Sequence, residues 1–300
     1  MKQTAAAVLD ASRKGRQGAI TILRDHPVKE PKEDEVLVKV LLRPIHPVDI
    51  KTLSLTYPGF DSRYLPAVVG SEGVGKVARN GVRASKFAEG MRVVAVPWPT
   101  GTANGGTWQQ YVSVPEANLV AVPDAVPDEA AAQFFLNPAT AYGFLEVLQV
   151  QELLDVGADA VICTEDEDVV SRVQDITGGE LAYGAVDPVA GAMTRTLAAA
   201  TRAGGTVYVY GSLGGAESTV ALMDLVYRGV TLKGFWLFPW LKSLSNEQRA
   251  EVLQQLMRLV AEGVVAPHSG KRFPLEQAGE AVQASQAPGR ASEGKFFLEG

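Results

Sequence analysis

The sequence contains one cysteine, Cys163, and three histidines among its 300 residues. A single cysteine excludes an intrachain disulfide and a zinc site built from several cysteines, and it is typical of a protein from a reducing compartment. The histidines, His26, His46 and His268, lie far apart, and none has metal-ligand spacing to another histidine or to the cysteine. We therefore expect structural or surface histidines and no metal site.

Long hydrophobic runs are also lacking. No stretch approaches the roughly 20 apolar residues that a membrane helix needs, and the opening residues lack the apolar core of a secretory signal. The formal net charge of −6 argues against nucleic acid or an anionic membrane as the main partner. These absences favour a cytoplasmic protein that acts on a small molecule, without nucleic acid or membrane as a partner.

The first 123 residues consist largely of short apolar or alternating segments separated by glycine, proline and asparagine. These segments lie at residues 5–10, 19–28, 35–45, 74–79, 92–97, 107–114 and 119–123. Many short strands with few helical stretches predict a β-barrel or a β-sandwich.

Beyond Pro123 the pattern changes to alternating helices and strands. Residues 127–135 predict a helix, and the break at 136–138 precedes a second helix, for which Pro138 suits the first position. Strand-like segments then follow at 160–164, 181–187, 206–212 and 230–237, with helical segments at 167–179 and 192–205 between them. This alternation predicts βαβ units and a parallel sheet.

A further helix is predicted near residue 250. Ser245 and Gln248 form a capping box, and Leu253, Leu256 and Val260 form an apolar stripe that ends at Gly263. The remaining residues predict one more helix and a final strand.

The glycine-rich segment at residues 70–76 nearly matches two phosphate-binding motifs, the P-loop and the dinucleotide fingerprint. Both motifs require a helix after the glycines, so that its N-terminus faces the phosphate. Here residues 76–82 form a strand-like run ending in an Asn-Gly turn, and Val77 stands where a P-loop needs a hydroxyl. We predict a tight bend inside the β-rich region rather than a phosphate loop.

Six segments, taken in order, resemble the medium-chain dehydrogenase/reductase superfamily, in particular its zinc-independent quinone oxidoreductase and 2-enoyl thioester reductase branch. They lie at residues 44–51, 57–59, 65–75, 106–111, 137–142 and 234–237. The zinc-dependent relatives carry cysteine where this chain has His46 and histidine where it has Ser71, so the resemblance implies no zinc. It implies an α/β protein with two domains. One is a GroES-like β-barrel catalytic domain of residues 1–123 and 266–300, and the other is a Rossmann-type doubly wound domain of residues 124–265.

The resemblance also implies an activity, namely the NADPH-dependent reduction of activated C=C bonds in 2-enoyl thioesters or quinone-like enones by a homodimer. Tyr57 matches a tyrosine that assists protonation or anchors the substrate in the enoyl reductases, although by itself it is typical of a turn before Pro58-Gly59. The residues implied to contact the cofactor are Asn137, Tyr210, Gly211, Ser212, Leu213, Phe235, Trp236, Leu237, Phe238 and Lys295. Alternatively, Asn137 is a helix N-cap, and residues 235–238 serve core packing or a subunit interface.

One part of the family pattern is missing near residue 150. Residues 146–150 run directly into 151–157, where the family places the first strand, its glycine turn, the first helix and the second strand. A βαβ unit takes roughly 30 residues, and its turn and helix N-terminus normally hold the pyrophosphate.

We therefore predict a truncated nucleotide-binding domain, with weak or absent NADPH binding. Its shortened ends could join in one helix through residues 144–153. The sheet would lose its central strands and would rearrange, or pair across a dimer, with reduced stability. Two alternatives stay open, namely a non-catalytic homologue that binds a small ligand without turnover and a deletion form without stable function.

Overall fold

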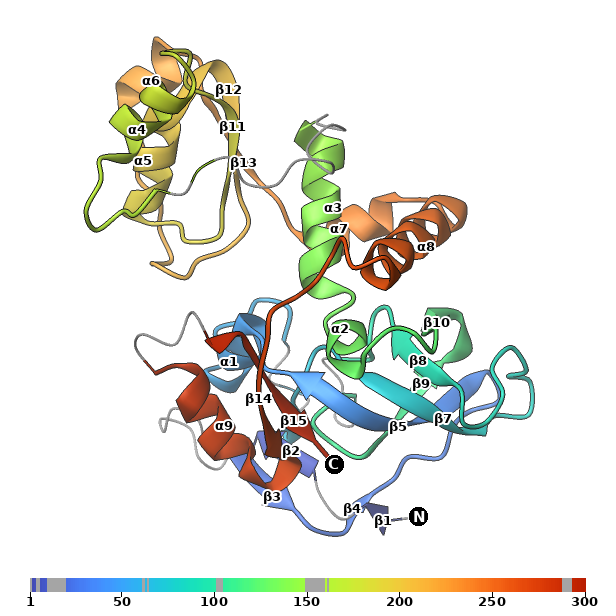
Figure 1. Ribbon diagram of the computed structural model, residues 1–300. Helices are drawn as coiled ribbons and strands as arrows, with labels where there is room; N and C mark the ends of the chain where they lie inside the picture. The colour runs from blue at the N-terminus through green and yellow to red at the C-terminus, as the bar shows by residue number, and fades with distance from the viewer. Residues whose placement is uncertain are drawn as a thin grey trace. The chain divides into compact units, whose positions relative to one another are not determined.

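The computed structural model describes residues 2–3, 6–9, 20–60, 63, 65–100, 105–148, 160, 162–287 and 293–300. The chain forms two compact units, coloured along the sequence in Figure 1. Unit 1 comprises Met1–Ala139 and Ala250–Gly300, and unit 2 comprises Thr140–Arg249. The catalytic domain expected over 1–123 and 266–300 lies within unit 1, and the exact division into functional domains stays a prediction.

Unit 1 is built on a seven-stranded sheet in the order β10-β8-β7-β5-β15-β14, with β9 also paired to β5. Its strands are β5 (Glu35–Pro44), β7 (Val74–Asn80), β8 (Arg92–Ala95), β9 (Tyr111–Pro115), β10 (Leu119–Ala121), β14 (Ser269–Pro274) and β15 (Lys295–Glu299). A second sheet, β3-β2-β6, and the pair β1-β4 comprise β1 (Lys2–Gln3), β2 (Ala6–Leu9), β3 (Ile20–Leu23), β4 (His26–Pro27) and β6 (Ala67–Val68). The β-rich region predicted from the sequence is confirmed, whereas β14 was not predicted.

Strand β5 is the centre of unit 1 because it pairs with β7, β9 and β15. Val36, Val38 and Val40 on this strand are fully buried, and Val36 and Val38 pair with Val114 and Val112 of β9. Burying one such side chain contributes about 1.5–3 kcal/mol. The β-branched run at residues 35–45 thus forms the strand predicted for it and anchors the core.

The helices of unit 1 are α1 (Pro47–Leu53), α2 (Asp128–Ala132) and α9 (Ala278–Ser285), while α3 (Leu136–Leu148) and α8 (Asn246–Ala261) contain residues of both units. The predicted capping box of α8 is confirmed. The Ser245 N–H donates to Gln248 Oε1 at 2.9 Å, and the Gln248 N–H donates to Ser245 Oγ at 3.2 Å. In contrast, α3 begins at Leu136 rather than at Pro138, so the predicted break at 136–138 was placed too late.

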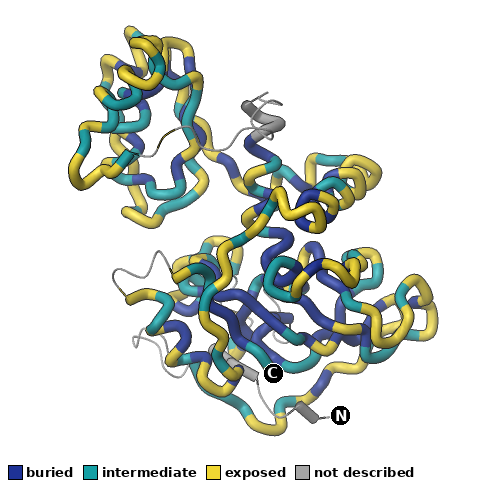
Figure 2. The backbone as a smooth tube through the Cα atoms, in the orientation of Figure 1, coloured by how far each residue is buried: buried dark blue, intermediate teal, exposed yellow. Residues whose placement is uncertain are grey.

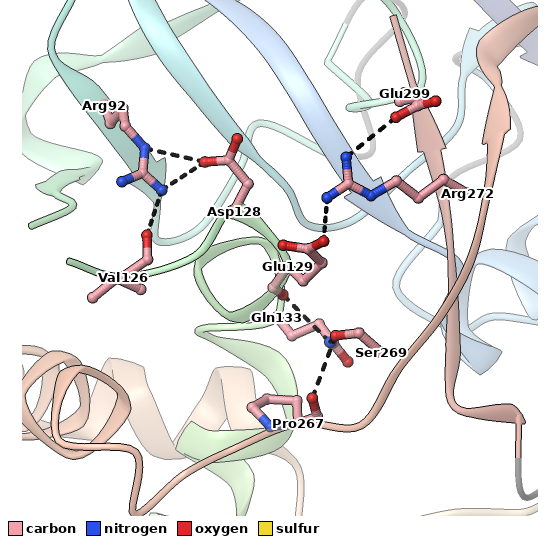
Figure 3. A network of polar contacts seen from close by, with 9 residues as sticks. All are labelled: Arg92, Val126, Asp128, Glu129, Gln133, Pro267, Ser269, Arg272 and Glu299. Carbon is pink, nitrogen blue, oxygen red and sulfur yellow. Dashed lines mark hydrogen bonds and ion pairs between the residues drawn. The ribbon is translucent and has the colours of Figure 1, made fainter. Parts of the chain in front are cut away.

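Helix α2 is fixed to the strands of unit 1 by charged side chains (Figure 3). Arg92 of β8 donates to Asp128 at 2.6 Å and to the Val126 carbonyl at 2.7 Å. Arg272 of β14 pairs with Glu129, which lowers the pKa of that carboxyl group, and also with Glu299. These contacts hold α2 against the main sheet of unit 1.

Unit 2 contains a three-stranded sheet in the order β11-β12-β13, and both strand pairs are parallel. Its elements are β11 (Ala182–Asp187), β12 (Thr201–Val209), β13 (Thr231–Gly234), α4 (Val169–Ile176), α5 (Ala192–Ala200), α6 (Leu222–Val226) and α7 (Leu237–Ser243). Helix α5 packs against β11 and β12 and also against α4 (Figure 1). The predicted parallel sheet is confirmed.

Two predicted elements of this unit were wrong. Residues 160 and 162–164 are not in a strand, and a strand persists only where a neighbour takes up its hydrogen bonds. The helix predicted over 192–205 ends at Ala200, where Thr201 donates its hydroxyl to the Leu197 carbonyl at 2.7 Å and β12 begins.

Unit 2 buries fewer apolar side chains than unit 1, and yellow and teal dominate its tube in Figure 2. Its buried cluster consists of Ala198, Val207 and Val230. On β11, which is an edge strand among the described residues, Tyr183 and Val186 are 56% and 39% exposed. The predicted helix through residues 144–153 is described as α3 up to Leu148. Its continuation and the junction at 150–151 lie outside the described residues.

Candidate functional site

Two polar side chains far apart in the sequence meet in the interior of unit 1. His46 Nε2 lies 2.7 Å from Glu72 Oε2, and each side chain is 2% exposed. The other carboxylate oxygen of Glu72 accepts hydrogen bonds from the backbone N–H groups of Phe135 and Leu136. A carboxylate at a helix N-terminus is favourable, which explains why α3 begins at Leu136. His46 is thus structural, as expected, but its partner was not predicted.

Asp49 is a second buried carboxyl group beside His46. Its Oδ2 accepts the backbone N–H of His46 at 2.8 Å, as part of the capping box of α1. Burial raises the pKa of Asp49, while the nearby His46 and Lys295 oppose that rise. Lys295, a predicted cofactor residue at the start of β15, therefore lies close enough to act on Asp49. Pro47 and Asp49 at the helix start were the sequence signal that could have revealed this group.

Tyr57 lies in the turn after α1, and its backbone N–H donates to the Lys51 carbonyl at 3.2 Å. Its ring folds over Gly59. A Cβ at Gly59 would lie 2.6 Å from Tyr57 Cε1 and 3.0 Å from the hydroxyl oxygen. The position of the ring thus depends on glycine at residue 59, and the catalytic role of Tyr57 stays a prediction.

Asn137 is exposed and lies within the first turn of α3. The alternative that it is the N-cap of this helix is therefore wrong. Its contact with a cofactor stays a prediction.

The glycine-rich segment at 70–76 leads into a strand, β7, as predicted, and not into a helix. Gly70 has φ +106°, and a Cβ there would lie 2.3 Å from Trp108 Cδ1. In β7, a Cβ at Gly75 would lie 2.5 Å from the Lys39 carbonyl oxygen of β5. These glycines allow a bend and a close approach of two strands, and the predicted bend and following strand are confirmed.

Two predicted cofactor segments lie side by side in unit 2, at the carboxyl ends of β12 and β13. The Phe235 N–H donates to the Val209 carbonyl at 3.0 Å, directly before Tyr210. The Tyr210 and Gly211 N–H groups donate to the Asp187 carbonyl at the end of β11, at 3.0 and 3.3 Å. Ligands of open α/β sheets bind outside the carboxyl ends of the strands. The structure therefore gathers residues 210–213 and 235–238 where such a ligand is expected.

The backbone in this region leaves no room for a side chain at residue 211. A Cβ at Gly211 would lie 2.0 Å from the Pro188 carbonyl oxygen, and the Leu213 N–H donates to the same oxygen at 3.3 Å. The loop after β12 is thus held against the loop after β11.

The side chains of these segments divide into buried and exposed groups. Phe235 and Leu237 are 9% and 6% exposed, so the core-packing alternative describes these two residues. Tyr210, Leu213 and Trp236 are 41%, 63% and 50% exposed. We call these three the strand-end surface. Each presents an exposed flat or branched apolar group after the carboxyl end of β12 or β13.

Tyr210 of the strand-end surface and the buried Phe235 both pack against Phe144 of α3. Its ring centroid lies 4.6 Å from that of Phe235 and 4.8 Å from that of Tyr210. Partial burial and the nearby Asp187 raise the pKa of Tyr210 above its usual value, so its hydroxyl stays a hydrogen-bond donor at neutral pH.

Two family models match the chain. Residues 32–124 match the alcohol dehydrogenase GroES-like domain, and residues 156–295 match the zinc-binding dehydrogenase domain. Within the described residues, no group of three His, Cys, Asp or Glu side chains is placed to hold a metal ion, and none of the helices there is long and apolar enough to cross a membrane.

Curated relatives match over most of the chain. The mitochondrial enoyl-[acyl-carrier-protein] reductase of Xenopus tropicalis is 30% identical over 315 positions, which cover 89% of this chain and 88% of the relative. The corresponding protein of Arabidopsis thaliana is 28% identical, covering 83% of this chain and 76% of the relative. The 315-position Xenopus alignment exceeds the 300 residues of this chain. The relative thus has positions without a counterpart here.

Solved structures share the fold. The quinone oxidoreductase of Escherichia coli, solved as a complex with NADPH, has a TM-score of 0.81 at 21% identity, covering 99% of this chain and all of that one. The quinone oxidoreductase of Pseudomonas syringae has a TM-score of 0.81 at 22% identity, again covering 99% of this chain. The expected α/β architecture, with a GroES-like domain and a Rossmann-type sheet, is confirmed.

Proposed function

Because this chain belongs to the medium-chain dehydrogenase/reductase superfamily, we propose that it is an NADPH-dependent reductase of activated carbon–carbon double bonds. The observation that carries this proposal is the gathering of residues 210–213 and 235–238 at the carboxyl ends of parallel strands. The curated relatives are named as enoyl reductases, and they favour 2-enoyl thioesters over quinone-like enones as the substrate class.

Unit 2 would hold the reactive end of the cofactor. The strand-end surface would flank the nicotinamide ring, and backbone groups of residues 235–238 would bind its carboxamide. Ser212 in the same loop, and Asn137 and Lys295 in unit 1, are further proposed contacts. When bound, NADPH would supply a hydride to the substrate β-carbon, breaking the C=C π bond and leaving an enolate and oxidised cofactor.

Tyr57 of unit 1 would complete the reaction. The enolate carries negative charge on the thioester oxygen and the α-carbon, and a hydroxyl donor stabilises such charge. The Tyr57 hydroxyl would donate its proton to the α-carbon, and solvent would return a proton to the phenolate. The product is the saturated thioester, with one hydride and one proton added.

We also expect a homodimer in the cytoplasm, although the curated relatives are mitochondrial by name. Leu222, Met223 and Val226 of α6 are 69%, 60% and 62% exposed. Adjacent exposed apolar side chains are typical of protein interfaces, so they support a subunit contact, which sedimentation of the purified chain would test.

The activity is tested by following NADPH oxidation with a 2-hexenoyl thioester. We expect Tyr57→Phe to lower kcat by about 10²-fold, the usual size of a positioned proton donor's contribution. Gly59→Ala should lower kcat less, because it displaces the ring without removing the hydroxyl. The matched control is Tyr227→Phe, at a tyrosine that is 74% exposed, and it should leave kcat unchanged.

Full activity of Tyr57→Phe would exclude the proposed role of this residue. A folded chain without turnover on thioesters or enones would contradict the reductase proposal. It would favour the alternative of a homologue that binds a small ligand without turnover.

A further inference from the structure

We infer that this chain recognises only the nicotinamide end of its cofactor, so that reduced nicotinamide riboside binds about as well as NADPH. The inference rests on the proposed function, since it concerns the same loops after β12 and β13. It adds that the pyrophosphate and adenosine end contributes little to binding.

The nicotinamide end has a formed site. The three residues of the strand-end surface, Tyr210, Leu213 and Trp236, remain exposed, while Phe235 and Leu237 beside them are buried. The loop that carries Tyr210 is held by N–H bonds from residues 210, 211 and 213 to carbonyls at the end of β11. The site is thus pre-organised, and its apolar groups suit an uncharged, flat dihydropyridine ring.

A pyrophosphate needs a different kind of site. Dinucleotide-binding folds hold it on the free N–H groups of a helix N-terminus, where the helix dipole places partial positive charge. A carboxylate that already uses those N–H groups removes the donors and repels a second anion. Whether the described residues suit a pyrophosphate therefore depends on whether carboxylates already lie at the helix N-termini.

The turn between β11 and α5 holds a carboxylate that takes up backbone N–H groups just before α5. Asp187, fully buried at the end of β11, accepts the N–H groups of Val189 and Ala190, both at 2.9 Å. Its other oxygen accepts the hydroxyl of Thr194, in the first turn of α5, at 2.6 Å. A phosphate here would have to displace these bonds and approach a buried carboxylate.

Carboxylates also lie at the N-terminal ends of the other long helices. In α4, Asp168 accepts the Ser171 N–H at 2.8 Å, and in α3, Glu72 accepts those of Phe135 and Leu136. Glu247 and Glu280 lie in the first turns of α8 and α9. Among the described residues, α3 and α4 therefore have a carboxylate bonded at the N-terminal end, α8 and α9 have one in the first turn, and α5 follows a turn that contains the Asp187 carboxylate.

The sequence has no room for the usual pyrophosphate-binding unit near residue 150. Residues 146–150 run directly into 151–157, whereas a βαβ unit takes roughly 30 residues.

A binding experiment tests the inference without requiring turnover. The probes are NADPH, reduced nicotinamide riboside and 2′-phospho-ADP-ribose, titrated against the purified full chain while quenching of tryptophan fluorescence is followed. We expect the Kd values of NADPH and the riboside to agree within about tenfold, which is 1.4 kcal/mol or less. 2′-Phospho-ADP-ribose should not displace either ligand.

Two tyrosine variants locate the site. Tyr210→Ala should raise the Kd values of NADPH and the riboside by the same factor, because both ligands would contact the strand-end surface. Tyr183→Ala is the matched control, since Tyr183 is an exposed tyrosine on β11 of the same unit, and it should change neither Kd.

Binding of NADPH more than 100-fold tighter than the riboside would overturn the inference, as would displacement by 2′-phospho-ADP-ribose or no binding of the riboside. Failure of the proposed function is distinguishable from these outcomes. If both ligands bind equally but neither supports thioester reduction, the reductase proposal fails while the inference about recognition stands.

Discussion

Unit 1 and unit 2 both contain a sheet with helices packed near it, but the two sheets differ in how far their strands are paired and their side chains buried. In unit 1 the central strand β5 has paired neighbours on both sides, and Val36, Val38 and Val40 are fully buried. In unit 2 the described sheet has β11 as an edge, with Tyr183 more than half exposed. Most of the exposed large hydrophobic side chains belong to unit 2, although it is the smaller unit.

The difference shows that strand-forming residues do not by themselves make a stable sheet. A parallel sheet normally has both faces covered and its edges protected. We therefore expect unit 2 to unfold at a lower urea concentration than unit 1. Each unit contains two tryptophans, Trp98 and Trp108 in unit 1 and Trp236 and Trp240 in unit 2, so fluorescence of paired Trp→Phe variants separates the two transitions.

The largest effect is expected from Arg43, at the centre of unit 1. This fully buried guanidinium donates to the carbonyls of Thr107, Gln109 and Leu298 at 3.0, 2.7 and 3.4 Å, and burial lowers its pKa to about 9. Arg43→Met would leave buried carbonyls without donors, and we expect it to lower the free energy of unfolding by about 3 kcal/mol. The transition of unit 1 would then approach that of unit 2.

The matched control is Arg79→Met. Arg79 is 43% exposed and pairs with Glu30 at the surface, where such a pair contributes about 1 kcal/mol or less. Equal losses in the two variants, measured by urea unfolding, would contradict the role assigned to Arg43.

A smaller effect is expected from Asp187 in unit 2. Asp187→Ala removes the acceptor of two backbone N–H groups and of the Thr194 hydroxyl. We expect it to lower the free energy of unfolding by about 2 kcal/mol. The loss should appear in the unit 2 transition alone. Asp175→Ala is the control, at a side chain that is 72% exposed. A shift of the unit 1 transition by Asp187→Ala would show that the two units do not unfold separately.

The smallest effect concerns Asp49 and pH. Because burial raises the pKa of this carboxyl in the folded state, the folded protein binds its proton more tightly than the unfolded chain does. The resulting stabilisation is present below the ordinary carboxyl pKa and is lost as pH rises through the folded-state value. Asp49→Asn, which keeps the acceptor for the His46 N–H, should abolish this loss. We expect its stability relative to the native chain to rise between pH 4 and pH 7.

Urea unfolding at both pH values measures this change. Asp124→Asn, at an exposed aspartate in the same unit, is the control and should show no comparable trend. A difference between Asp49→Asn and the native chain that is independent of pH would exclude the proposed coupling.

Several elements could be predicted from local sequence because local forces determine them. The apolar run of β5, the capping box of α8 and the strand after the glycines at 70–76 all formed as expected. Strand β14 was missed because its residues are polar and largely exposed, and it exists through its pairing with β15. The strand predicted at 160–164 was wrong for the opposite reason, since its residues are apolar but have no described neighbour to pair with.

The sequence by itself determined the family, the change from a β-rich part to alternating helices and strands, and the segments at the ends of β12 and β13, because these depend on residue type and spacing along the chain. Only the tertiary structure decided which side chains meet. Glu72 is 26 residues from His46 and more than 60 from the start of α3, yet it bonds to both. Asp187 likewise takes up the N–H groups before α5. Such contacts depend on how strands and turns bring distant residues together in a dry interior, where each polar group must find a partner.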